Sequence, residues 1–234
     1  MRLNRYVALS SKYSRRQADA LIAGGHVKVN GQTVYGLGTQ VTSNHDRVEL
    51  YGRAIRPRHY VYYALNKPVG YASTTFDPFA ARKVTDLVPR RPRVYPVGRL
   101  DRNSEGLLIL TNDGDFTYLL THPRHFIDKE YYVEAVPRQE DWDTTRLREI
   151  TSGMELDGYE TKPTKIHGWK YLKGKVSFYI ILREGRKRQI RRLAQKIGLQ
   201  VMVLRRVRIG RLRLSNIKPG HYDTITPERV LGEL

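Results

Sequence analysis

The chain has 234 residues, 40% of them hydrophobic, which is enough for two modest domains or one large domain with a buried core. Its 42 Lys and Arg outnumber 23 Asp and Glu, and the net charge of +19 predicts a polyanionic partner, because each neutralised phosphate releases counterions. The absence of cysteine excludes disulfides, thiolate catalysis and cysteine-based zinc sites. Residues 1–5 form no apolar signal region, and no run approaches the ~18 apolar residues of a membrane span, so we expect a cytoplasmic protein with no membrane partner.

Residues 1–50 predict a small module of two helices and a hairpin. The first helix ends near Ser10, and the second runs over 15–23 behind the N-cap residue Ser14. Asn30-Gly31 predicts a tight hairpin between strands at 26–29 and 32–34, and a last strand is expected at 47–50. The basic side chains of this module are candidates for RNA phosphate contacts, although a solvated helix face explains any one of them equally well. They include Arg2, Arg15, Arg16 and Lys28.

Residues 51–59 are expected to form a linker between this module and a larger body at 60–234. The segment contains glycine, proline and three arginines and has no periodicity, which is typical of a semi-flexible connector. A short edge strand is the alternative, since an edge tolerates the proline.

The body predicts a mixture of strands and helices. Helices are expected at 116–120, at 138–150 and from the glycine corner at 185 to about residue 197, and a loop with a short helix is expected at 75–93. Strands are expected at 60–65, 94–97, 107–110, 128–135, 165–167 and 175–182.

The segment 97–115 is the strongest candidate for a site. Two short strands joined by a polar loop would hold Arg99 and Asp101 rigidly at one end of a sheet. A carboxylate two residues from a guanidinium, in so basic a chain, indicates an anionic substrate beside a nucleophile or base. The alternative is an ordinary turn residue or surface ion pair.

No metal site is expected. Asp113 and Asp115 lie in an Asn-Asp-Gly-Asp sequence, which is typical of turns and helix N-caps. His122 and His125 are three residues apart, but Pro123 between them disrupts a helical metal pair.

A cationic segment extends from Arg183 to Lys218, with 13 Lys and Arg against the single acid Glu184. Apolar residues are interleaved with these charges, which indicates a basic face on folded elements and not a disordered tail. Such a face predicts phosphate contacts.

Residues 98–114 carry a resemblance to a known family. The pattern G-R-L-D-x-x-S-x-G-L-L-I-L-T-N-D-G resembles the catalytic motif of the RsuA/RluB family of RNA pseudouridine synthases at every specified position. The segments 65–74, 182–193 and 204–220 are similar to further motifs of that family. Residues 2–31 resemble the αL RNA-binding motif of a small-subunit ribosomal protein, a module that helps these enzymes to select RNA.

The resemblance implies an α+β fold and a set of site residues. The small RNA-binding domain would precede a mixed, mainly antiparallel sheet flanked by helices, with the active site in a basic cleft. Asp101 would be the nucleophile at the sugar or the base that starts a glycal route, Arg191 would pair with it and keep it ionised, and Tyr131 would stack on the uracil, while Tyr132 faces the other way.

Further residues are expected to bind the RNA. Because the target base must leave its stack, a side chain should fill the gap, and Arg99 is the candidate. Lys67 would either contact a phosphate or cap its corner of the chain. The arginines next to the third motif that are best placed for phosphates are Arg186, Arg188 and Arg192.

The expected partner is ribosomal RNA or a ribosomal-subunit assembly intermediate, bound by a monomer that needs no cofactor, metal or nucleotide. The Glu184–Arg192 motif and the lack of a C-terminal tail favour the branch that modifies large-subunit (23S) rRNA, and the small-subunit (16S) branch is the runner-up. Two other classes remain open. One is a non-catalytic RNA-binding or ribosome-assembly protein, and the other is an RNA methyltransferase, which would need a Gly-rich cofactor loop that we do not find.

Overall fold

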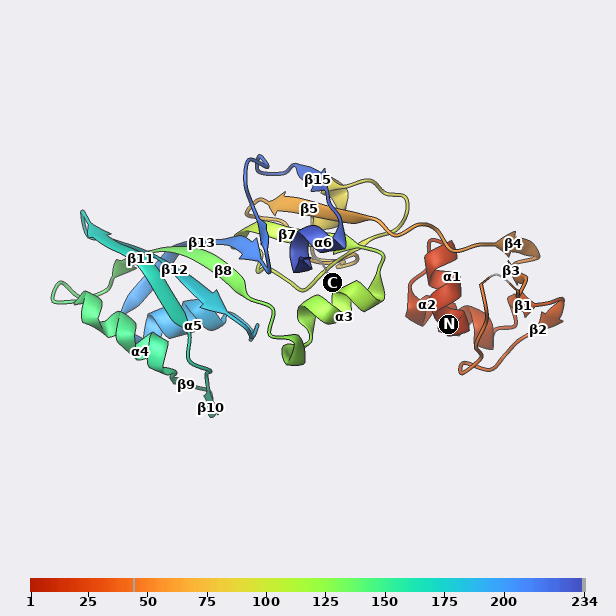
Figure 1. Cartoon of the computed structure of the whole chain (residues 1–234), viewed down its shortest axis with the longest axis horizontal. Helices are drawn as coiled ribbons and strands as arrows, with labels where there is room; N and C mark the ends of the chain where they lie inside the picture. Colours follow the sequence, from red (N-terminus) through yellow and green to blue (C-terminus); the bar gives the residue numbers. More distant parts are fainter. Residues whose placement is uncertain (44, 233–234) are drawn as a thin grey trace. The chain divides into compact units, whose positions relative to one another are not determined.

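The computed structural model describes residues 1–43 and 45–232, which form two compact units (Figure 1). The first unit holds residues 1–61 with 90–94, and the second holds residues 62–89 with the chain from Tyr95 onward. No helix within the described residues is long and apolar enough to cross a membrane.

The first unit packs two helices against a small antiparallel sheet of order β2-β1-β3-β4. Ser14 caps the second helix, as the sequence predicted, and the structure adds a capping box between Ser14 and Gln17. Asn30 and Gly31 adopt the positive φ angles of a tight hairpin. The elements are α1 (Leu3–Ser10), α2 (Arg15–Ala23), β1 (Val27–Val29), β2 (Gln32–Thr33), β3 (Val48–Leu50) and β4 (Arg53–Ile55).

Strand β4 lies within the segment 51–59 that was expected to be a linker. It pairs with β3 through a tight turn at Tyr51 and Gly52, both of which have positive φ. The connector interpretation was therefore wrong for residues 53–55, which form the edge strand that the sequence left as the alternative.

The second unit is built on a nine-stranded sheet with seven strands in the order β11-β12-β8-β13-β7-β5-β15, while β14 pairs with β13 and β6 with β7. Among the described strands of this sheet, only the pairing of β13 with β7 is parallel, so the expectation of a mainly antiparallel sheet is confirmed. The strands are β5 (Tyr62–Lys67), β6 (Tyr95–Pro96), β7 (Glu105–Thr111), β8 (Lys129–Pro137), β11 (Lys165–Leu172), β12 (Lys175–Leu182), β13 (Leu199–Ile209), β14 (Leu212–Arg213) and β15 (Tyr222–Thr224), with a separate hairpin of β9 (Glu155–Leu156) and β10 (Tyr159–Glu160).

Helices cover the sheet in two groups (Figure 1). Near β7 and β5, side chains of α3 and α6 enter a buried cluster with Leu107 and Ile109. Near β12 and β13, the alternating burial of β12 marks one covered face, on the side of α4 and α5. The helices are η1 (Val84–Leu87), α3 (Gly114–Thr121), η2 (Pro123–His125), η3 (Thr144–Arg146), α4 (Leu147–Ser152), α5 (Gln189–Lys196) and α6 (Pro227–Leu231).

Asp113 has the capping role that its sequence context predicted. Its carboxylate accepts hydrogen bonds from the backbone of Asp115 and Phe116 at the start of α3, and from the Tyr62 hydroxyl at 2.8 Å. Among the described residues, no group of three or more His, Asp or Glu side chains could hold a metal ion.

The helix expected at 138–150 was wrong in its first half, because regular structure begins only at Thr144. Asp143 caps that turn through the Thr145 N–H, and the Trp142 indole donates to the Ile197 carbonyl at 2.6 Å. Side-chain capping and this long-range hydrogen bond override the apolar periodicity of the segment.

Candidate active site

The second unit contains a cavity of about 960 Å³. It is lined by residues of the β6–β7 loop, of β8 and β13, and of the segment that precedes α5. It brings together side chains that lie far apart in the sequence. Five of the predicted site residues line it, namely Asp101, Tyr131, Arg99, Arg186 and Arg188.

The β6–β7 loop presents Asp101 half-buried at the cavity wall, while Arg99 is exposed beside it. Lys67, at the end of β5, is hydrogen-bonded to the backbone of this loop. The Lys67 ammonium donates to the carbonyls of Ser104 at 2.6 Å, Pro68 at 3.1 Å and Asp101 at 3.2 Å. Asp101 is thereby placed on a backbone that is fixed at several points.

The expectation that Lys67 binds RNA was wrong. Its side chain is 0% exposed, and its hydrogen bonds go to backbone carbonyls, so the alternative of a corner cap is the one observed. Burial lowers the pKa of Lys67 to about 8, and the attraction of Asp101 and Glu105 acts against this shift. The ammonium therefore stays mostly protonated at neutral pH and keeps its three donors.

Tyr131 and Tyr132 face opposite sides of β8, as strand geometry predicted. Tyr131 is 9% exposed and lines the cavity. Tyr132 lies on the other face, where its ring is 5.4 Å from that of Tyr179. Of these two tyrosines, only Tyr131 is placed to meet a base in the cavity.

Arg191 lies close to the Asp101 loop but does not form the expected ion pair with its carboxylate in the described part of the chain. Its guanidinium donates to the carbonyls of Asn103 at 2.8 Å and Val201 at 3.0 Å. Burial and the nearby Arg188 lower the pKa of Arg191, whereas the charge of Asp101 raises it. Arg191 thus fixes the loop that carries Asp101 and acts on the carboxylate through space.

Two further basic residues, Lys129 and Arg206, line the cavity and were not among the predicted site residues. Arg206 is 3% exposed, donates to the Leu107 carbonyl at 2.7 Å and lies 6.0 Å from the centre of the Tyr131 ring. Its Nη2 atom is buried with no hydrogen-bond partner. Burial, followed by the charge of Arg206, lowers the pKa of Lys129 to about 8. Arg206 lies in the segment 204–220 that resembles a family motif, but its place opposite Tyr131 follows from the pairing of β13 with β8.

The other predicted RNA-binding residues lie outside this cavity. Arg192 forms an ion pair with Asp157. In the first unit the remaining candidates are exposed on or near α1, α2 and β1, and they are Arg2, Arg15, Arg16 and Lys28.

A carboxylate and a buried tyrosine that line one strongly basic cavity indicate a site for an anionic substrate. The RNA pseudouridylate synthase family matches residues 61–196, and the S4 domain family matches residues 1–48. The chain therefore belongs to the RNA pseudouridine synthases, which are isomerases acting on RNA, and it carries an N-terminal S4 domain.

Similar proteins agree with this assignment over nearly the whole chain. One is "Ribosomal large subunit pseudouridine synthase B" of Bacillus subtilis, 38% identical over 98% of this chain and 93% of that protein. Another is an RNA pseudouridine synthase of Aquifex aeolicus, 37% identical over 95% of this chain and 89% of its own length. A crystal structure of a pseudouridylate synthase covers 98% of both chains, with 25% identity and a TM-score of 0.66.

Proposed function

We propose that this chain converts one uridine of large-subunit ribosomal RNA to pseudouridine, with Asp101 as the catalytic carboxylate. The observation that carries the proposal is the position of Asp101, half-buried in the same cavity as Tyr131 and surrounded by arginines. The name of the Bacillus subtilis relative supports large-subunit rRNA as the substrate.

The reaction breaks the bond between uracil N1 and ribose C1′, turns the base, and joins C5 to C1′. The proton on C5 is lost and N1 regains a proton, so the atoms balance and no oxidant or energy source is needed. In the proposed mechanism, the Asp101 carboxylate either attacks C1′ or removes the C2′ proton to start a glycal route. Both routes need an ionised carboxylate at the ribose.

The residues around Asp101 position the substrate. Tyr131 stacks on the uracil, and Arg99 fills the gap that the flipped base leaves in the RNA. Lys67 and Arg191 hold the backbone of the catalytic loop through its carbonyls. Arg186 and Arg188, which line the cavity, contact phosphates.

We further propose that the enzyme acts as a monomer in the cytoplasm on rRNA or on an assembly intermediate. The S4 domain would bind a second part of the same RNA through its exposed arginines.

Pseudouridine mapping of both rRNAs, in cells with and without the gene, tests this proposal. One 23S uridine should lose its mark, and purified wild-type protein should restore it, whereas Asp101→Asn should bind the RNA with similar affinity but form no product. Asp223→Asn is the matched control, because Asp223 is exposed on β15 and lies outside the cavity lining. A lost mark in 16S rRNA would transfer the proposal to the small subunit. If Asp101→Asn retained full turnover, Asp101 would not be the catalyst.

A further inference from the structure

The loop 74–80 carries two phenylalanines at the mouth of the catalytic cavity. Phe76 is 79% exposed and Phe79 is 93% exposed, yet both line the same cavity as Asp101. These exposed rings add no buried apolar area to the core of the protein. Two such rings in the same cavity as the proposed catalytic residue indicate a contact with the substrate.

The loop is held in shape by its own hydrogen bonds. Phe76 N–H donates to the Thr74 hydroxyl at 3.2 Å, and that hydroxyl donates to the Phe76 carbonyl at 2.8 Å. Phe79 N–H donates to the Asp77 carboxylate at 2.9 Å, and Pro78 lies between these two residues. The two rings are therefore carried by consecutive tight turns.

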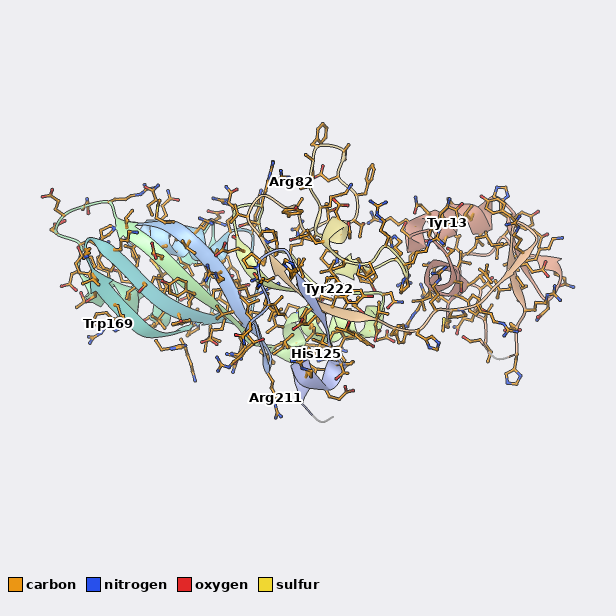
Figure 2. All side chains as sticks on the ribbon, turned by 90° about the horizontal axis from the view of Figure 1, so that it is seen from above. Tyr13, Arg82, His125, Trp169, Arg211 and Tyr222 are labelled. Atoms are coloured by element: carbon orange, nitrogen blue, oxygen red, sulfur yellow. The ribbon has the colours of Figure 1, made fainter. Side chains whose placement is uncertain are left out.

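The base of the loop is joined to the catalytic loop. The Ser73 hydroxyl donates to the Leu100 carbonyl at 2.8 Å and accepts from the Leu100 N–H at 3.1 Å, directly before Asp101. At its other end the loop returns to Ala72, whose N–H donates to the carbonyl of Arg82, a residue labelled in Figure 2. The position of the two rings is thus tied to the position of the catalytic carboxylate.

The surroundings indicate the chemistry of the partner. Arg99 and Arg102 lie on the neighbouring β6–β7 loop, and Arg186, Lys187 and Arg188 of the segment before α5 also line the cavity. Cations that bind phosphates, together with exposed rings, form the combination by which proteins hold unpaired nucleic acid, because every base offers a face for stacking. Bases inside a duplex offer no free face to a side chain.

We propose that Phe76 and Phe79 stack on unpaired bases next to the target uridine, and that the substrate is therefore a uridine in a loop, bulge or other single-stranded segment. This inference rests on the proposed function, since it concerns the RNA that reaches Asp101. The two rings select the structural context of the uridine, while Asp101 performs the reaction.

The test uses an RNA fragment around the mapped uridine, in which 2-aminopurine replaces a base adjacent to the target. Stacking on an aromatic ring quenches the fluorescence of this base. The wild type should quench it, and Phe76→Leu/Phe79→Leu should not, because leucine keeps the apolar surface but has no ring to stack. Phe79→Trp should retain the quenching. The double variant should bind the unpaired RNA about tenfold or more weakly and raise KM, with kcat at saturating RNA nearly unchanged.

Two controls separate this contact from a general effect. Leu172→Ala changes an apolar side chain that is 70% exposed and outside the cavity, and it should leave both quenching and KM as in the wild type. When a complementary strand pairs with the segment, wild type and double variant should bind equally, because no unpaired base remains.

The outcomes are distinguishable. If wild type forms no pseudouridine in rRNA, the proposed function fails and this inference falls with it. If wild type is active and the double variant matches it in quenching and KM, the stacking contact alone is refuted. If the double variant fails only on particles that contain ribosomal proteins, the rings contact protein, which also overturns the inference.

Discussion

At the scale of single residues, the site depends on a buried lysine that does not touch the substrate. Lys67 is the last residue of β5, and its ammonium donates hydrogen bonds to the carbonyls of Pro68, Asp101 and Ser104. A buried cation is costly unless it is fully hydrogen-bonded, and here the backbone satisfies it. The lysine therefore links the stability of the fold to the position of Asp101.

Lys67→Met should destabilise the protein and slow catalysis. The substitution keeps the length of the side chain but leaves buried carbonyls without donors, which we expect to reduce the free energy of unfolding by about 3 kcal/mol. Displacement of the Asp101 loop should lower kcat by roughly 100-fold. Urea unfolding and single-turnover kinetics measure both effects. Lys218→Met, at an exposed position, is the matched control. A normal kcat in Lys67→Met would show that the lysine does not position Asp101.

The adjacent tyrosines of β8 allow a second comparison at this scale. Tyr131→Ala should lower kcat/KM by roughly 10- to 100-fold, because it removes the stacking surface, and Tyr131→Phe should retain most of the activity. Tyr132→Ala should leave the kinetics unchanged, since this ring packs against Tyr179 on the other face. Equal kinetic losses in Tyr131→Ala and Tyr132→Ala would point to a distorted strand and argue against stacking by Tyr131.

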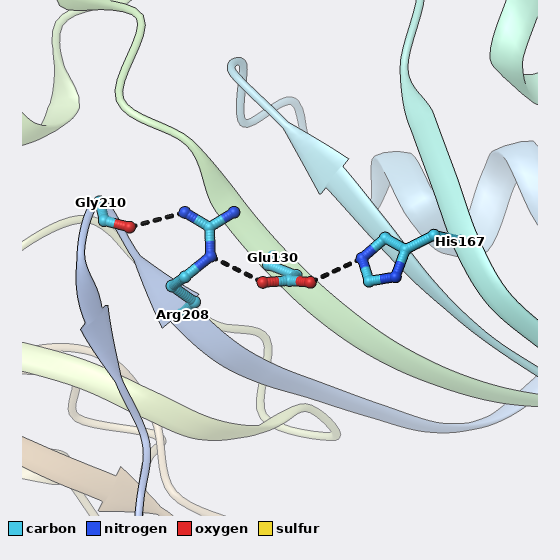
Figure 3. A network of polar contacts seen from close by, with 4 residues as sticks. All are labelled: Glu130, His167, Arg208 and Gly210. Atoms are coloured by element: carbon cyan, nitrogen blue, oxygen red, sulfur yellow. Dashed lines mark hydrogen bonds and ion pairs between the residues drawn. The ribbon is translucent and has the colours of Figure 1, made fainter.

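At the scale of elements, a polar network joins three strands of the sheet (Figure 3). Glu130 of β8 accepts from Arg208 of β13 at 2.7 Å and lies 2.7 Å from the ring nitrogen of His167 on β11, and Arg208 also donates to the Gly210 carbonyl. Burial by itself raises the pKa of Glu130, but the hydrogen bonds and charges of Arg208 and His167 outweigh it, so that the pKa falls below its ordinary value of 4.5. The ionised form is thus favoured by folding.

Glu130→Gln should reduce the free energy of unfolding at neutral pH, and this free energy should then change less as the pH falls. A carboxylate with a lowered pKa stabilises the fold above its unfolded pKa, and this contribution is lost as the pH falls through the folded value. At pH 7 the variant should lose about 3 kcal/mol, since Arg208 is left without its charged partner, and the difference from wild type should shrink below about pH 4.5. Urea unfolding over this pH range measures it. Glu134, on β8 like Glu130, forms a solvent-accessible pair with Lys175 of β12, and Glu134→Gln should cost less than about 1 kcal/mol. If the difference in unfolding free energy between wild type and Glu130→Gln stayed constant with pH, Glu130 would not be the carboxylate with the lowered pKa.

Local sequence signals predicted most elements but not their long-range placement. The capping box at Ser14, the hairpin at Asn30-Gly31 and the strands that flank Asp101 all follow from short-range chemistry. The helix at 138–150 failed because Trp142 is held by a residue 55 positions away. For the same reason the motif at 204–220 did not place Arg206 beside Tyr131, since that position depends on the pairing of β13 with β8.

The close approach of β7 and β13 is another feature that only the assembled sheet explains. Gly106 has a φ of +100°, and a Cβ there would lie 2.4 Å from the Arg206 carbonyl oxygen. The family motif contains this glycine, but its reason is the parallel pairing that sets Arg206 beside the catalytic loop. The glycine in the motif is thus required by the close approach of β7 to β13.

At the scale of the whole molecule, the positive charge is shared between two units that are each folded around their own core. The second unit contains the cavity with Asp101, and the S4 unit carries the exposed Arg15 and Arg16. Affinity that comes from many phosphate contacts falls with salt in proportion to their number, so the contribution of each unit can be counted.

Arg15→Ala/Arg16→Ala should weaken RNA binding and reduce its dependence on salt. If both arginines contact phosphates, the slope of log K against log salt concentration should fall by roughly 1.5, since each contact contributes about 0.7 to 0.9. Filter binding of the target rRNA fragment over a range of salt concentrations measures the slope. Arg47→Ala is the control within the same unit, because Arg47 is already paired with Glu49 at 2.9 Å. Turnover at saturating RNA should be unchanged, since neither arginine lies in the cavity. An unaltered slope with a reduced kcat would mean that the S4 unit acts on catalysis and not on affinity.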